Sequence, residues 1–231
     1  IEGYSSAVHF ERFTELFSIR GAVVPLDEAL ALICHFADED VEPQAVIADL
    51  DQLASTMSAT SAVELMAELF GPSGFTGNSF EYDDPSNSLM HQVITRRLGI
   101  PITLCALAIE VGRRVDIDLV GIGMPGHFLC RTASQANHQF FDPFHSPRPL
   151  SAEQCRMLYE NLTQIDNWSA EFLEPSSSRL MVVRVLSNLK SIYRRRSDSA
   201  NLRWVMRLRS VIPEIAASET VEFAQLMRGS N

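Results

Sequence analysis

The segment GIPITLCALAIEVGRRV, residues 99–115, contains the clearest structural signal in the sequence. Gly99 ends one predicted helix, and Pro101 suits the first position of the next, where the missing N–H of proline has no consequence. Residues 103–109 leave no polar side, so they predict a short helix that is buried in the middle of a domain. Only the last turn of this helix is charged, with two arginines that suit the negative end of the helix dipole.

The hydrophobic period then changes from that of a helix to the alternation of a strand. Strands are expected over residues 119–122, 128–131 and 138–141, the last two forming a hairpin across the polar linker 132–137. A buried helix followed by a small, antiparallel sheet is typical of an α+β domain.

Residues 8–70 predict a helical N-terminal region. Three helices are expected there: residues 26–37, a helix that begins at Pro43, and residues 59–70. Residues 71–86 are rich in Gly, Ser, Asp and Asn and predict an irregular loop. Ser86 or Asn87 is expected to cap a helix that runs to Arg97.

The chain becomes helical again after residue 150. Helices are expected over residues 151–163, 179–196 and 202–212. The last two, joined by a tight turn and followed by Pro213, resemble half of a tetratricopeptide array, and one such helical hairpin must dock on the body of the protein. We therefore expect three units: an N-terminal helical region (1–70), a core (71–165) and a helical tail (179–231).

Size and composition indicate an ordinary globular protein. The chain has 231 residues, of which 46% are hydrophobic and 21% are charged, enough for one domain with a small annex or two small domains. No apolar run approaches the ~20 residues that a membrane helix requires. The first four residues include neither an initiating Met nor a secretion signal, and we expect that this end was trimmed.

The cysteines indicate a reducing environment. They are Cys34, Cys105, Cys130 and Cys155, and no pair has the spacing of a redox or zinc motif. Reduced thiols are typical of a cytoplasmic protein, which is the location we predict. Because the six histidines are equally scattered, we predict no metal site and no cofactor.

Charge is distributed unevenly along the chain. The net charge of −10 argues against a nucleic-acid partner. Residues 179–209 nevertheless contain nine basic residues and one acidic residue, a net charge of +8, whereas residues 1–178 contain nine basic and twenty-five acidic residues, a net charge of −16. Either these basic helices pack on the acidic body, or Arg194, Arg195 and Arg196 form a face for an acidic partner.

A thiol, an imidazole and a carboxylate occur in the order Cys105, His127, Asp142, the set used by a thiol nucleophile, its base and its orienting acid. Cys105 lies about one turn inside its helix, near the end where a helix lowers a thiol pKa, although a lone buried cysteine usually serves packing. The predicted hairpin brings His127 close to Asp142. His138 and His145 flank the Asp142 strand and could line the same cleft.

Several motifs occur in an order that resembles one family. They are Gly74-Phe75-x-Gly77-Asn78, Asn87-Ser88-x-Met90-x-x-Val93, Arg97-x-Gly99-Ile100-Pro101-Ile102-Thr103-Leu104, Val120-Gly121-x-x-x-Pro125-Gly126-His127-Phe128-Leu129, Phe141-Asp142-Pro143-Phe144 and Arg184-Val185-Leu186-x-Asn188-Leu189-Lys190-x-Ile192-Tyr193. Over roughly residues 24–213 the chain resembles the SirB-type transglutaminase-like family, including its tetratricopeptide-like C-terminal helices.

This resemblance implies a papain/transglutaminase-like core, in which a central helix packs on a small antiparallel sheet. His127 and Asp142 match the second and third catalytic positions of the superfamily. The nucleophile of the superfamily usually follows a Gly-x-Cys pattern at the start of the helix. Its counterpart here is Gly99-Ile100-Pro101, so Pro101 stands at the position of the nucleophile.

Two functions follow from these observations. In the first, the protein is a non-catalytic protein-interaction or regulatory module, a degenerate relative of thiol enzymes that binds a protein partner through Arg194, Arg195 and Arg196. The alternative is a cysteine-dependent amide hydrolase or acyltransferase. In that enzyme Cys105 attacks the substrate, His127 carries the proton and Asp142 orients His127.

Overall fold

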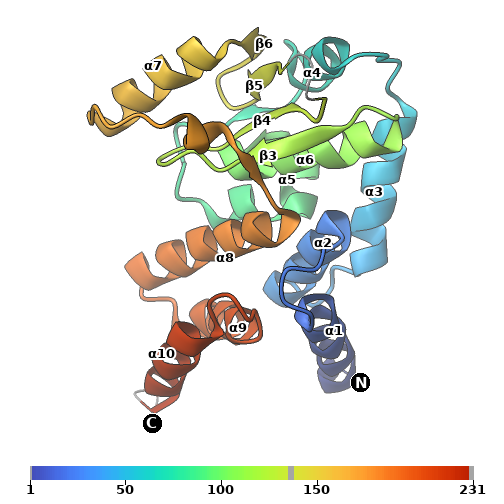
Figure 1. Ribbon diagram of the computed structural model, residues 1–231. Coiled ribbons are helices and arrows are strands. Elements are labelled where there is room, and N and C mark those ends of the chain that lie inside the picture. Colours follow the sequence, from blue (N-terminus) through green and yellow to red (C-terminus); the bar gives the residue numbers. More distant parts are fainter. Residues whose placement is uncertain (1, 135–137, 229–231) are drawn as a thin grey trace.

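The predicted central helix, α6 (Pro101–Arg114), lies at the middle of the molecule (Figure 1). The computed structural model describes residues 2–134 and 138–228, so the predicted linker 132–137 lies partly outside the described residues. Side chains 104–108 of α6 are fully buried, as their apolar character predicts. One face of the helix contacts the sheet, and other faces contact the N-terminal helices and the long C-terminal helix.

A five-stranded antiparallel sheet covers α6, and its strand order is β6-β5-β4-β3-β7. The strands are β3 (Leu119–Ile122), β4 (Leu129–Thr132), β5 (Phe140–Asp142), β6 (Ser146–Leu150) and β7 (Pro175–Ser176). Helix α7 (Ala152–Thr163) lies over the opposite face, where a second apolar cluster includes Phe140, Cys155 and Tyr159. The predicted α+β class, with a central helix on a small antiparallel sheet, is confirmed.

The sequence pattern missed four strands, of which two, β6 and β7, form the edges of this sheet. β6 contains Pro147 and Pro149, which remove backbone donors and therefore weaken any strand prediction. An edge position tolerates these prolines because one side of an edge strand needs no partner. A separate parallel pair joins β1 (Thr76–Gly77) to β2 (Leu98–Gly99).

The N-terminal helices are α1 (Glu2–Phe17), α2 (Leu26–Ala37), α3 (Pro43–Ser55) and α4 (Ala62–Phe70). The predicted start of the last one at residue 59 is wrong, because the Ser61 hydroxyl accepts the Glu64 N–H and caps the helix there. The predicted cap at Ser86 or Asn87 is also wrong. Those residues form the short helix η1 (Pro85–Ser88), and α5 (Met90–Arg96) begins after it.

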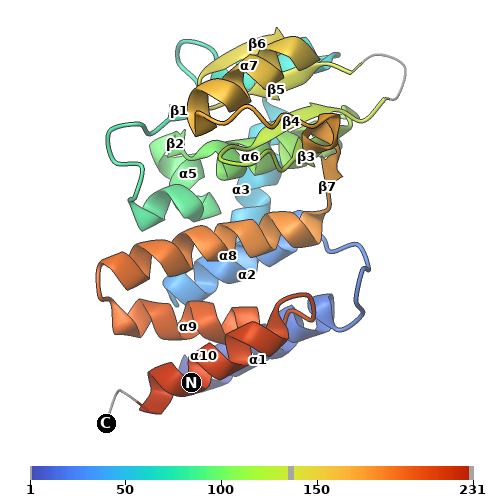
Figure 2. The ribbon, with the colours of Figure 1, turned by 60° about the vertical axis from the view of Figure 1, so that its left-hand side comes forward.

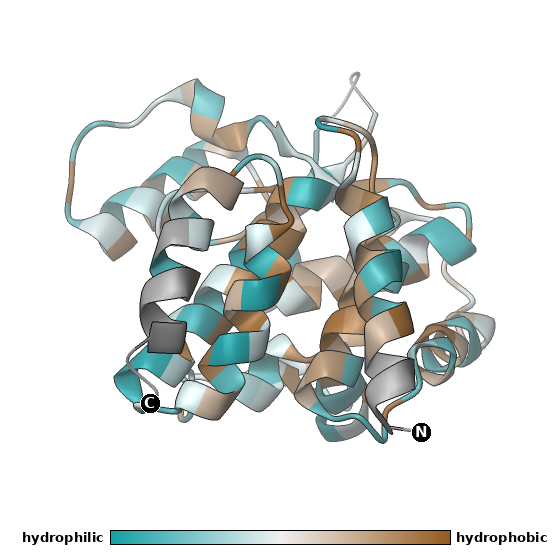
Figure 3. Cartoon of the chain, turned by 90° about the horizontal axis from the view of Figure 1, so that it is seen from below, coloured by the Kyte–Doolittle hydropathy of each residue, from teal (hydrophilic) through white to brown (hydrophobic). Residues whose placement is uncertain are grey.

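The C-terminal part consists of η2 (Ala170–Leu173), α8 (Ser178–Arg195), α9 (Ser199–Ser210) and α10 (Ala216–Arg228). α8 packs on α2 and α6, α9 contacts α8 and α1, and α10 contacts α9 (Figure 2). Seen from below, brown and teal residues alternate along the coloured helices, as expected of helices with one buried and one solvent-facing side (Figure 3). The division of the chain into three units stays a prediction.

Buried ion pairs hold α10 in place. Lys190, the single lysine of the chain, lies 2.9 Å from Glu219 and 2.7 Å from Glu222. Arg209 lies 2.7 Å from Glu219, whose side chain is 6% exposed. Burial alone would raise the pKa of Glu219, but hydrogen bonds from Arg209 and Lys190 outweigh it and lower the pKa. Among the described helices, none is long and apolar enough to cross a membrane.

Candidate functional site

His127 and Asp142 meet at one end of the sheet. His127 precedes β4, and Asp142 ends the neighbouring strand β5, so the predicted hairpin brings the two side chains together. Nε2 of His127 lies 2.9 Å from Oδ2 of Asp142, and each side chain is 5% exposed. Gly126 takes a left-handed φ of 78° in the turn before His127, a conformation that favours glycine.

A second imidazole approaches the same carboxylate oxygen. Nδ1 of His145 lies 2.7 Å from Oδ2 of Asp142, while the backbone N–H of Phe144 donates to Oδ1 at 3.2 Å. Burial alone would raise the pKa of Asp142, but the hydrogen bonds from His127 and then His145 outweigh it and lower the pKa. His145 therefore belongs to the cleft, whereas the exposed His138 contacts Arg131 instead.

Phe144 supports both imidazoles. Its ring meets His127 and His145 nearly edge to face, at interplanar angles of 80° and 83°. Gly77 lies against this ring, because a Cβ atom at Gly77 would be 2.5 Å from Phe144. The motif that contains Gly77 and the motif that contains Asp142 and Phe144 therefore contact each other in the structure. The sequence did not predict this contact.

Cys105 does not join this pair. Its side chain is fully buried, and Sγ donates to the backbone carbonyl of Phe128 at 3.7 Å. Burial, and then the neighbouring Cys130 thiol, raises the pKa of Cys105 well above its ordinary value. Within the described residues, no interaction links Cys105 to the ring of His127. The structure thus brings together two of the three predicted triad residues, and the catalytic role of all three stays a prediction.

The N-terminal end of α6 leaves little space for a bound molecule. The Thr103 hydroxyl accepts the Ile100 N–H at 3.1 Å and donates to the carbonyl of Asn87 at 2.7 Å. The adjoining cavity measures about 30 Å³. It is lined by Tyr82, Pro101, Ile102, His127, Phe128, Arg184 and Asn188. Such a volume accommodates about one water molecule.

Arg184 of α8 also lines this cavity. Its guanidinium donates to the carbonyl of His127 at 3.0 Å and lies 5.7 Å from the centre of the Phe128 ring. Burial lowers the pKa of Arg184. The sequence reading included Arg184 in a family motif and missed that it reaches the candidate site.

The three predicted partner-binding arginines lie at the end of α8, and two of them pair with carboxylates within the chain. Arg194 pairs with Glu222, Arg195 lies 2.6 Å from Asp83, and Arg196 donates to the carbonyl of Asp83 at 3.0 Å. The side chains of Arg194 and Arg195 remain 55% and 53% exposed. The face is therefore accessible, although its charge is partly balanced.

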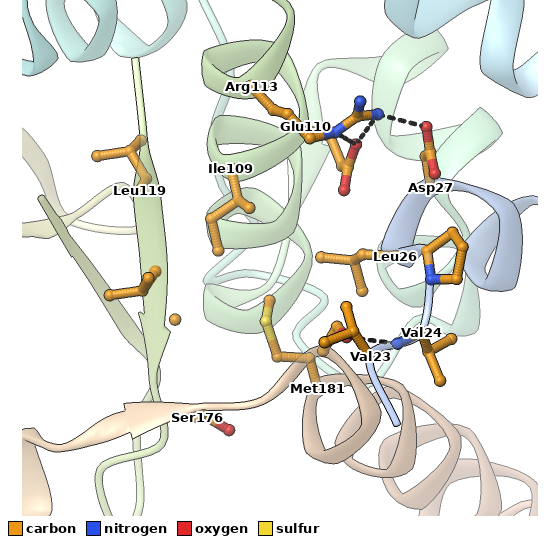
Figure 4. A pocket seen from close by; sticks show the side chains of 14 residues that line it. Val23, Val24, Leu26, Asp27, Ile109, Glu110, Arg113, Leu119, Ser176 and Met181 are labelled. Carbon is orange, nitrogen blue, oxygen red and sulfur yellow. Dashed lines mark hydrogen bonds and ion pairs between the residues drawn. The ribbon is translucent and has the colours of Figure 1, made fainter. Parts of the chain in front are cut away.

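A larger cavity of about 500 Å³ lies between α2, α6, β3 and α8 (Figure 4). Val23, Leu26 and Met181 supply apolar walls. Its charged groups pair with one another, since Arg113 lies 2.7 Å from Asp27 and 2.8 Å from Glu110. These three charged residues are consequently occupied in ion pairs that tie α2 to α6.

The chain is similar in sequence to a known superfamily and to several known proteins. The model of the transglutaminase-like superfamily matches residues 39–187. A UPF0162 protein of Xylella fastidiosa is 43% identical over 129 residues, which are 54% of this chain and 46% of that protein. A UPF0162 protein of Pseudomonas aeruginosa is 32% identical over 147 residues, 63% of this chain and 52% of that protein. The chain thus spans about half the length of these relatives.

A more distant similarity extends to animals. Human F-box only protein 21 is 32% identical over 92 residues, which are 36% of this chain and 15% of that protein. No solved structure matches the chain. The family predicted from the sequence motifs is confirmed by the superfamily match and by the similarity to UPF0162 proteins.

Proposed function

Since the chain belongs to the transglutaminase-like superfamily, we propose that it is a non-catalytic member that binds another protein. One observation carries this proposal. At the start of α6, where the resemblance places the nucleophile of the superfamily, the chain has Pro101 and a cavity of only about 30 Å³.

A thiol enzyme needs an accessible thiolate beside its imidazole base. Cys105 is fully buried with a raised pKa, and its sulfur contacts the Phe128 carbonyl rather than His127. Pro101 offers neither a nucleophile nor a backbone N–H for an oxyanion. The space between Pro101 and His127 is too small for an amide substrate. These features support loss of the chemistry with retention of the fold.

The partner surface that we propose combines Phe80 with Arg194, Arg195 and Arg196. Phe80 is fully exposed, and the Arg195 and Arg196 contacts to Asp83 anchor its loop to α8. Protein interfaces concentrate binding energy in aromatic and arginine side chains. The partner is a protein that offers an apolar pocket for Phe80 and acidic residues around it. The 92-residue match within a much longer F-box protein supports use of this fold as a module.

The hydrogen bond between His127 and Asp142 favours the alternative, a cysteine-dependent amide hydrolase or acyltransferase. Because Asp142 occupies Nε2 of His127, Nδ1 remains the ring nitrogen for a nucleophile. Under this alternative, Cys105 must move out of the core before it reacts.

Alkylation of Cys105 distinguishes the two functions. The folded chain is treated with iodoacetamide across a pH series, and modification is located by peptide mass spectrometry. We expect Cys105 to react no faster than the equally buried Cys34, and only after denaturation. Rapid alkylation well below the free-thiol pKa of ~8.5, lost in His127→Ala, would establish the enzyme and contradict our proposal.

Partner binding is tested with the full chain as bait. We expect Phe80→Asp, and the charge reversal of Arg194, Arg195 and Arg196, to abolish recovery of a cross-linked protein. Ile19→Asp is the matched control, because Ile19 is 69% exposed and lies outside the proposed surface. Equal recovery with all variants contradicts the surface, and circular dichroism checks that each variant is folded.

A further inference from the structure

We propose that His127, Asp142 and His145 bind one divalent transition-metal ion of the zinc class. One potential ligand atom from each residue lies within 4.8 Å of the other two. Two imidazoles and one carboxylate form a donor set that suits Zn²⁺, Fe²⁺ and related ions. This inference does not depend on the proposed protein-binding function.

Two of the three distances between donor atoms are close to those of a metal site. Oδ2 of Asp142 lies 2.9 Å from Nε2 of His127 and 2.7 Å from Nδ1 of His145. Zinc–ligand bonds of about 2.0–2.1 Å separate neighbouring donor atoms by roughly 3 Å or slightly more. The ion takes the place of the protons in these two hydrogen bonds. Those protons pass to solvent or to the other ring nitrogens, so that each imidazole binds the ion in its neutral form.

Backbone contacts fix each of the three ligands. The Arg184 guanidinium holds the carbonyl of His127, and the Phe144 N–H holds the second oxygen of Asp142. The His145 N–H donates to the backbone carbonyl of Asp142 at 3.1 Å, which closes the turn between these two ligands. The Phe144 contact resembles the outer hydrogen bonds that orient ligating carboxylates in metal sites, and the other two contacts fix the backbone that carries the imidazoles. The carboxylate and two neutral imidazoles together carry one negative charge, which favours a dication.

The site is accessible and has room for a further ligand. The side chain of His145 is 51% exposed. Asp142 and His145 line a cavity of about 320 Å³, which Gln154, Leu158 and Asn161 of α7 bound on the other side. Three protein ligands leave at least one coordination position open, and water or a small anion in this cavity would fill it.

The proposal departs from the sequence-based prediction of no metal site. Asp142 follows His127 by fifteen positions, and a β-hairpin brings the two together. A short sequence motif therefore does not predict the site. The four cysteines are fully buried and do not compete for the ion in the folded protein.

Titration of the metal-stripped full chain with Zn²⁺, followed by calorimetry, tests the proposal. We expect one ion per chain. The affinity should fall at least ~10-fold in His145→Ala and in Asp142→Asn, because loss of an outer contact alone already weakens metal binding by about that factor. His138→Ala is the matched control, because His138 is an exposed histidine of the same region that contacts Arg131. Its affinity for Zn²⁺ is expected to equal that of the unmodified chain. Co²⁺ should give visible absorption bands that disappear in His145→Ala.

Two results would overturn the site. One is a dissociation constant for Zn²⁺ weaker than about 100 µM. The other is an affinity that is unchanged in His145→Ala, a half-exposed position where substitution leaves the fold intact. If Asp142→Asn does not fold, His145→Ala alone decides. The alkylation and cross-linking experiments are done without added metal, so failure of the metal site leaves their outcome unaffected.

Discussion

Asp142 and Glu219 are buried carboxylates with nearly equal exposure, 5% and 6% of the side chain, but with different partners. Glu219 faces the guanidinium of Arg209 and the ammonium group of Lys190. Asp142 faces two imidazoles, side chains that also bind metal ions. The comparison teaches that the Glu219 cluster is a permanent structural lock, whereas the Asp142 cluster can exchange its hydrogen bonds for a metal ion.

The largest effect is expected from Glu219→Ala. The substitution leaves Arg209, which is 8% exposed, and Lys190 without their shared carboxylate. Breaking a buried ion pair in this way costs about 3–5 kcal/mol of stability. Urea denaturation measures the free energy of unfolding. A loss below about 1 kcal/mol would mean that Glu222 replaces Glu219, and the cluster would then not be a lock.

A smaller loss is expected from Asp142→Ala. The change removes the partner of the buried His127 and the acceptor of the Phe144 N–H. Leaving such a group unsatisfied costs about 1–3 kcal/mol, less than the about 3–5 kcal/mol expected when the buried Arg209 loses its carboxylate. The same urea experiment applies. A cost equal to that of Glu219→Ala would remove the proposed distinction between the two clusters.

Acid should remove the Glu219 contribution. Because the pKa of Glu219 is lower in the folded chain than in the unfolded chain, its stabilisation is complete above the ordinary glutamate pKa of about 4.3. That stabilisation is lost as the pH falls through the folded pKa. We expect the stability difference between the unmodified chain and Glu219→Gln to stay constant above about pH 5 and to shrink at lower pH. A difference that grows in acid would contradict the lowered pKa.

The smallest effect on stability is expected from His145→Ala. Its side chain is half exposed, and such substitutions usually change stability by about 0.5 kcal/mol or less. Thermal unfolding without added metal measures this change. A large loss would show that His145 is a structural residue, and the two clusters would then be more alike than we propose.

The sequence predicted the parts of the fold that follow from hydrophobic period. Helix α6, strand β3 and the antiparallel pairing of β4 with β5 follow from local patterns of apolar residues. The edge strand β6 was missed because its prolines contradict strand propensity, and its pairing with β5 and its packing against α4 stabilise it. Local pattern therefore identified the buried elements and failed where tertiary pairing determines the structure.

The candidate site was predictable only in part. The hairpin placed His127 beside Asp142, since two neighbouring strands bring their ends together. The direction of Cys105 was not predictable, because a helix that is apolar on every side does not reveal which neighbour each residue meets. Arg184 was missed for a related reason. Its contact with His127 spans 57 residues and depends on how α8 packs against the core.

The presence of one lysine, Lys190, in a buried ion pair has a practical consequence for chemical labelling. The chain has one lysine; its side chain is 12% exposed, and its ammonium group is bound to Glu219 and Glu222. Amine-directed reagents react with neutral, accessible amines, so this side chain should be protected in the folded protein. Modification of Lys190, located by peptide mass spectrometry, would then report separation of α10 from α8 and so local opening at the C-terminal end of the molecule.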